Sequence, residues 1–184
     1  MANPQTRTIL CYELVGALFI ILLGSMLHFT FELSGYNPIV GAFSAVNESV
    51  WEHLKLGFWP ALLWAIIEYW QIKKDANNFF LAKTAVPYAI TAIIPLIFYS
   101  YTSITRESIF IIDIMSFIVA VIIGQCMSYR LLTHKQLPPN IEKIALAALF
   151  LLAVAFIVFT FYPPQLPPFQ DPISGEYGIV EYMH

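Results

Sequence analysis

Five long apolar runs dominate this sequence and restrict what it can fold into. The hydrocarbon core of a bilayer is about 30 Å thick, and about 20 helical residues cross it. Runs close to that length lie near residues 8–29, 54–72, 79–101, 108–131 and 141–162. A helix satisfies its own backbone hydrogen bonds, as a segment in lipid must. The sequence therefore predicts an all-α integral membrane protein, built as a bundle of five transmembrane helices.

Composition agrees with this class. Of the 184 residues, 59% are hydrophobic and 11% are charged, whereas soluble domains average about 45–50% apolar and 25% charged residues. The net charge is −3 and no run of Lys or Arg is long enough to follow a phosphate backbone, so we expect no nucleic-acid partner. Neither a linker nor a repeat divides the chain, and we expect a single membrane domain over residues 1–184 with membrane lipid as its surroundings.

The short polar connections at 73–78, 102–107 and 133–140 predict that successive helices are antiparallel. In this arrangement the two ends of the bundle differ in charge. One end carries seven basic residues, Arg7, Lys73, Lys74, Lys83, Arg130, Lys135 and Lys143, and the other carries Lys55 and Arg106. The positive-inside rule places the first end in the cytoplasm. We therefore expect a multi-pass protein of the cell membrane with a cytoplasmic N-terminus and an extracellular C-terminus.

The C-terminal segment differs in amino-acid composition from the rest of the chain. Residues 163–184 contain five prolines, which favour extended or polyproline conformations over helix. The same segment is rich in aromatic and apolar residues. We expect an ordered tail that packs on the extracellular face.

Polar side chains on the predicted helices point to a site near the outer leaflet. At 100° per residue, His28 shares one side of the first helix with Gly16 and Gly24, and small residues mark faces that pack against protein. His53 and Asp113 lie on similar faces of later helices. The alternating helix directions bring all three to one depth. We predict that they converge, with three acidic side chains at the rim, Glu32, Glu48 and Glu52.

Two imidazoles with carboxylates are typical ligands of zinc or another divalent metal. We assign the ligand role to His28, His53, Asp113, Glu32 and Glu48. An open coordination position would activate water, and a carboxylate, Glu52 or Asp113, would act as general base. The pattern predicts hydrolysis or transfer on a small-molecule, lipid or peptide substrate at the membrane surface.

Structural explanations exist for the same residues. Ser49 and Glu52 have the spacing of a capping box, in which each side chain bonds to the backbone N–H of the other residue. Glu52 and Lys55 have the spacing of a surface ion pair. The trio of His28, His53 and Asp113 would also serve to lock helices together by hydrogen bonds.

A second polar set, Glu13, Glu68, Lys83 and Gln125, lies toward the cytoplasmic end. Glu68 and Lys83 are most simply explained as an ion pair between adjacent helices. The alternative, functional interpretation is that Glu13 and Glu68 line the inner half of a permeation path. Two alternative functions remain open. One is a small transporter or an ion- or proton-conducting homo-oligomer, and the other is a non-catalytic scaffold that binds a partner protein.

The stretch "LHFTFELSGYNPIVGAFSAVNESVWEHLKLGFWP" (27–60), with "IIEYW" (66–70) and "YPPQLPPFQDPISGEYGI" (162–179), is similar to a family of small polytopic bacterial membrane proteins classed as a domain of unknown function. The most specific parts are the NESVWEHLK motif and the PPxxPxFxDPxxGxYGI tail. The resemblance implies the membrane class and a single unit formed by the outer stretch and the tail. It implies no substrate and no catalytic residue.

Overall fold

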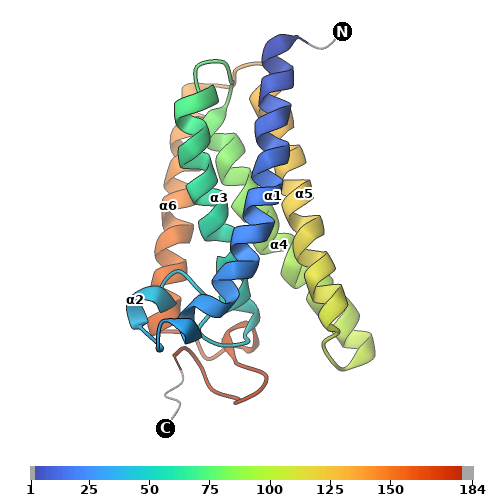
Figure 1. Cartoon of the computed structure of the whole chain (residues 1–184), viewed down its shortest axis with the longest axis vertical. Helices are drawn as coiled ribbons and strands as arrows, with labels where there is room; N and C mark the ends of the chain where they lie inside the picture. Colours follow the sequence, from blue (N-terminus) through green and yellow to red (C-terminus); the bar gives the residue numbers. More distant parts are fainter. Residues whose placement is uncertain (1–2, 180–184) are drawn as a thin grey trace.

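Five long helices run alternately up and down the molecule in the computed structural model, which describes residues 3–179 (Figure 1). They are α1 (Pro4–Leu33), α3 (Val50–Ile72), α4 (Phe79–Thr105), α5 (Phe110–Thr133) and α6 (Pro139–Phe161). Two short helices, α2 (Pro38–Gly41) and η1 (Pro167–Phe169), complete the described chain. The all-helical class is therefore confirmed. Each long helix covers most of one predicted run, and α1 extends four residues beyond it at both ends.

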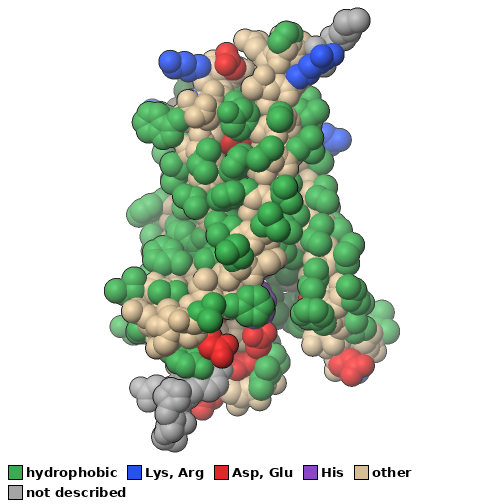
Figure 2. All heavy atoms as spheres, viewed as in Figure 1, with side chains coloured by type: hydrophobic (Ala, Val, Ile, Leu, Met, Phe, Trp, Pro, Cys, Tyr) green, Lys and Arg blue, Asp and Glu red, His purple; other side chains and the backbone are tan. Residues whose placement is uncertain are grey.

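Four of the long helices, α1, α4, α5 and α6, are long and apolar enough to cross a membrane. Their exposed surface is what lipid requires. On α1, for example, Leu14, Leu18 and Leu22 recur at helical spacing and are each more than half exposed. Hydrophobic side chains cover most of the visible face between the two ends (Figure 2). The remaining long helix, α3, carries Glu52, Lys55 and Glu68, all of which are buried.

The helices pack in a definite order. α1 packs against α3 and α5, while α4 packs against α3, α5 and α6. Glycines permit the closest of these approaches. A Cβ on Gly24 would collide with the backbone carbonyl of Leu56 on α3, so only glycine allows this contact between α1 and α3.

The end of the molecule away from the N-terminus gathers α2, the loop before α3 and the C-terminal tail (Figure 1). The Phe169 ring lies 4.8 Å from the Trp51 ring, and the side-chain amide of Asn47 donates to the Gly178 carbonyl at 2.7 Å. The tail thus packs on the segment that starts α3, up to residue 179. Residues 180–184 of the predicted tail lie outside the described part of the chain.

Candidate functional site

His28, Glu48 and His53 come together at this end of the molecule. One potential ligand atom from each lies within 4.8 Å of the others. His28 belongs to the last turns of α1, Glu48 to the loop and His53 to the first turn of α3. The two imidazole rings meet edge to face with their centroids 5.1 Å apart. Three segments that are separate in sequence therefore supply two imidazoles and one carboxylate to one point.

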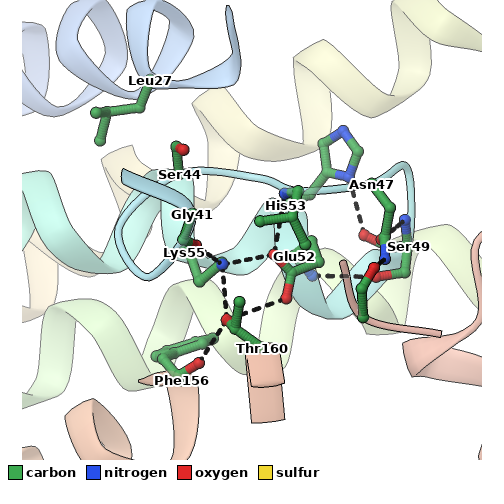
Figure 3. A network of polar contacts seen from close by, with 12 residues as sticks. Leu27, Gly41, Ser44, Asn47, Ser49, Glu52, His53, Lys55, Phe156 and Thr160 are labelled. Atoms are coloured by element: carbon green, nitrogen blue, oxygen red, sulfur yellow. Dashed lines mark hydrogen bonds and ion pairs between the residues drawn. The ribbon is translucent and has the colours of Figure 1, made fainter. Parts of the chain in front are cut away.

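A backbone hydrogen bond sets the tautomer of His53. Its Nδ1 lies 2.9 Å from the Ser49 carbonyl oxygen, which only accepts, so Nδ1 carries a hydrogen (Figure 3). Nε2 then faces Oε2 of Glu48 at 3.4 Å. In the neutral ring this nitrogen has a free lone pair. Metal-binding histidines are commonly oriented in this way, by a carbonyl that accepts from the second ring nitrogen.

The loop that carries Glu48 is held by its neighbours. The Asn47 side chain accepts from the Ser49 N–H at 2.9 Å, and the Ser49 hydroxyl accepts from the Glu52 N–H at 3.3 Å. The second bond is one half of the predicted capping box. The reciprocal half is absent from the described hydrogen bonds, because the Glu52 carboxylate accepts from the N–H of Val46 instead, at 3.1 Å.

Glu52 belongs to a separate buried network (Figure 3). Its Oε2 forms an ion pair with Lys55 at 2.5 Å, and its Oε1 lies 3.3 Å from the Thr160 hydroxyl. Lys55 also donates to Thr160 at 2.8 Å and to the Gly41 carbonyl at 2.7 Å. Glu52 is 2% exposed and Lys55 is fully buried. The predicted pair thus exists in the interior rather than on the surface, and it joins α3 to α6 and α2.

Asp113 lies elsewhere and is not a member of the His28, Glu48 and His53 group. It occupies the first turn of α5, where its carboxylate accepts from the Tyr101 hydroxyl at 2.6 Å. The Tyr101 oxygen in turn accepts from the Ile109 N–H at 3.1 Å. The predicted convergence of Asp113 with the two histidines is therefore wrong. The α4–α5 turn diverges from α1 at this end (Figure 1), and Asp113 closes that turn instead.

Glu32 follows His28 by one helical turn on α1 and is exposed. Residues at this spacing share one side of a helix. It is also outside the three-residue group. Of the five predicted ligands, the structure thus brings together His28, His53 and Glu48. Glu32 lies one turn from His28 on α1, and Asp113 is hydrogen-bonded to Tyr101 instead.

The electrostatics favour an ionised carboxylate in this group. When His53 is protonated, its Nε2–H donates to Glu48, and this hydrogen bond lowers the pKa of Glu48 below its ordinary value; partial burial opposes this effect, and the charges of His53 and His28 reinforce it. The side chains of His53 and Glu48 are 32% and 44% exposed. Figure 2 shows a recess between the main body and the lower α4–α5 turn, with histidine atoms visible at its wall. The group is therefore partly open to its surroundings.

The second polar set also comes together, within the helices. Lys83 of α4 lies between Glu13 of α1, at 2.6 Å, and Glu68 of α3. The predicted ion pair of Glu68 and Lys83 is confirmed. Ser128 of α5 is a further member, because its hydroxyl donates to Glu13 at 2.9 Å. Ser128 shares one side of α5 with Ala120 and Gly124, but helical periodicity alone does not reveal its partner.

The comparisons with known proteins identify a family and no activity. No curated protein and no solved structure matches the chain. A family model described as a family of unknown function, DUF6512, matches residues 2–179, which is nearly the whole sequence. The match includes α1 to α6 and the described part of the tail. The chain belongs to the DUF6512 family of unknown function.

Proposed function

We propose that the chain is a five-span membrane protein that binds a divalent metal with His28, Glu48 and His53 at its outer face. In this proposal α3 is the fifth span, and its charged groups are tolerated because each is paired inside the bundle. The proposed activity is hydrolysis or transfer on a lipid or peptide at the membrane surface. One observation carries the proposal: three segments direct ligand atoms to within 4.8 Å of one another.

Charge distribution supports the orientation. Blue Lys and Arg side chains gather at the end that bears the N-terminus, and red acidic side chains gather at the opposite end (Figure 2). Basic residues near the ends of spans are enriched on the cytoplasmic side. The proposed site then faces the exterior, or the periplasm in a cell with two membranes.

The ligand set supports zinc or a similar ion. Two imidazoles and one carboxylate are a known catalytic zinc set, in which the fourth position is left for water or substrate. The partial exposure of His53 and Glu48 is consistent with such an open position. A bound metal would supply Lewis acidity and lower the pKa of its water. Within the chain, the Ser49 carbonyl orients His53, and Glu48 contributes negative charge that retains the ion.

The surroundings support a substrate at the membrane interface. The site lies where apolar helices end, and the exposed ring of Phe29 stacks on His28 with the ring centroids 5.1 Å apart. Glu32 is the carboxylate on the same side of α1 as His28. We assign it the role of the general acid–base group that exchanges a proton with the substrate. Glu52 and Asp113 have no part in this proposal, because Lys55 and Tyr101 already occupy their carboxylates.

Elemental analysis tests the metal. Protein purified without chelator or added metal is expected to contain about one zinc or other divalent ion per chain, and a His28→Ala/His53→Ala variant is expected to contain none. The matched control is His134→Ala, an exposed histidine outside the group. Metal-free wild-type protein that also fails to take up zinc or cobalt on titration would refute the proposal.

A second function is supported by the buried charges of Glu13, Glu68 and Lys83. Ionisable groups at membrane depth commonly mark proton or ion pathways. A proton- or ion-coupled transporter predicts flux in proteoliposomes that depends on an imposed gradient. Flux that persists in the His28→Ala/His53→Ala variant and stops in Glu68→Gln would favour this function over the metal-dependent one.

A further inference from the structure

Four helices contribute to a buried charged cluster formed by Glu13, Glu68, Lys83, Gln125 and Ser128. The exposed fraction of every member is 5% or less. Lys83 donates to Glu13 at 2.6 Å and to Ser128 at 3.1 Å and forms an ion pair with Glu68. These three contacts use all three hydrogens of the ammonium group. Lys83 is therefore charged and fully coordinated.

The two carboxylates differ in their surroundings. Glu13 accepts from Lys83 and Ser128 on one oxygen. With the Gln125 amide oriented to satisfy both of its ends, Gln125 donates to the other oxygen at 2.5 Å. Donors on both oxygens are what an ionised carboxylate needs. Glu13 is thus the member best suited to carry the negative charge that balances Lys83.

Glu68 lacks this support. It is fully buried; Lys83 forms an ion pair with one of its two oxygens, and the indole N–H of Trp64, one turn earlier on α3, is the other donor near it. Among residues 3–179 neither oxygen accepts a hydrogen bond of ordinary geometry beyond that ion pair. An ionised carboxylate that is buried without donors is strongly disfavoured. The neutral acid avoids most of this penalty.

Apolar layers separate the cluster from water on both sides. One layer, toward the N-terminal end, consists of residues one helical turn away from cluster members: Ile9, Ile72, Phe79 and Leu132, with Ala76 and Ala82. The other layer consists of Ile20, Ala61, Val86, Ile90, Ala120 and Val121. Water and counterions therefore have no direct route to balance a net charge there.

We infer that the cluster is a proton-binding site inside the membrane, with Glu68 holding the proton at neutral pH. Two carboxylates and one ammonium sum to −1, and one bound proton makes the cluster neutral. The titratable groups that face Glu68 are Glu13 of α1 and Lys83 of α4; α5 contributes Gln125 and Ser128, which do not titrate. This inference is independent of the metal site. It gives the chain a ligand, H⁺, that a proton-coupled process can load and release.

Infrared spectroscopy with ¹³C-carboxyl-labelled glutamate tests the inference, because the C=O stretch of a neutral carboxyl group is separate from that of a carboxylate. At neutral pH the wild-type protein is expected to show one protonated glutamic acid. Glu68→Gln and Glu13→Gln are each expected to show none, because one acid then balances Lys83. Lys83→Met is expected to show two.

Glu107→Gln is the matched control, because Glu107 is exposed and its replacement should leave the band unchanged. Gel filtration and circular dichroism identify variants that fail to fold, and the Glu68→Gln result stands without Lys83→Met. A wild-type spectrum without a protonated carboxyl band, or a band that persists unchanged in folded Glu68→Gln, would overturn the inference.

Discussion

The Ser49 carbonyl accepts a hydrogen bond from Nδ1 of His53, and this bond turns Nε2 of His53 toward Glu48. Ser49 performs this task through its backbone, while its hydroxyl caps the same helix by accepting from Glu52. The start of α3 and the orientation of the candidate ligand are therefore one local structure. Any residue change that displaces this first turn also displaces the imidazole.

Glu48 provides a pH-dependent prediction for metal-free protein. The pKa of Glu48 is lowered in the folded state, mainly by the hydrogen bond with His53. Ionised Glu48 therefore stabilises the fold at pH values above its unfolded pKa, which is about 4.3. This stabilisation is lost as pH falls through the folded pKa. The effect also needs a protonated His53, so it weakens as pH rises and His53 loses its proton. With chelator present, Glu48→Gln should lower the melting temperature near pH 5.5 by the equivalent of less than about 1 kcal/mol.

At pH 8 the same substitution should change the metal-free melting temperature much less, since a neutral His53 has no hydrogen on Nε2 to donate. Thermal unfolding in detergent across this pH range measures both values. Glu176→Gln serves as an exposed acidic control. An equal effect of Glu48→Gln at both pH values would contradict the assigned tautomer.

The buried pair of Glu52 and Lys55 predicts strong coupling in stability. Lys55→Met leaves a buried carboxylate without its cation and should cost about 3–5 kcal/mol. The double variant Glu52→Leu/Lys55→Met should be more stable than Lys55→Met alone, because it removes both charges together. Denaturant unfolding of the four proteins in this double-mutant cycle gives the coupling energy. Additive effects would show that the two side chains act independently.

The close contact at Gly24 predicts that the packing of α1 against α3 affects metal binding. A Cβ at this position collides with the Leu56 carbonyl, so Gly24→Ala must separate α1 from α3 and should cost about 1–3 kcal/mol. His28 follows Gly24 by one turn, so the two imidazoles should also move apart. We expect weaker cobalt binding in an optical titration. Ser25→Ala, on the exposed side of α1, should bind as the wild type does.

The position of Ile72 leads to a prediction about how the proton on Glu68 is isolated from water. This side chain is 1% exposed and lies one turn beyond Glu68 in the apolar layer toward the N-terminal end. Ile72→Ala should leave space through which water reaches the cluster. The protonated carboxyl band should then exchange with D₂O faster than in the wild type. The control is Leu14→Ala, which changes an exposed leucine of α1. Equal exchange rates in the two variants would place the exchange route elsewhere.

Sequence patterns predicted correctly where several side chains of the candidate site lie. The i, i+4 spacing of Gly24 and His28 put His28 on the face that packs against α3, and the Ser49 signal marked the start of that helix. The opposite directions of two successive helices put His28 and His53 at the same depth. Those deductions need only the helical repeat and the antiparallel order of neighbours, which are local properties.

The sequence by itself determined the five long helices, their alternation, the inward direction of both histidines and the charge difference between the two ends. Only the tertiary structure decided which carboxylate meets the histidines. Helical periodicity defines the direction and depth of a side chain, but the distance between helices depends on how their side chains pack. Close packing at Gly24 joins α1 to α3, whereas the α4–α5 turn diverges and leaves Asp113 with Tyr101. Likewise Glu52 pairs with Lys55 because α6 and α2 close over both.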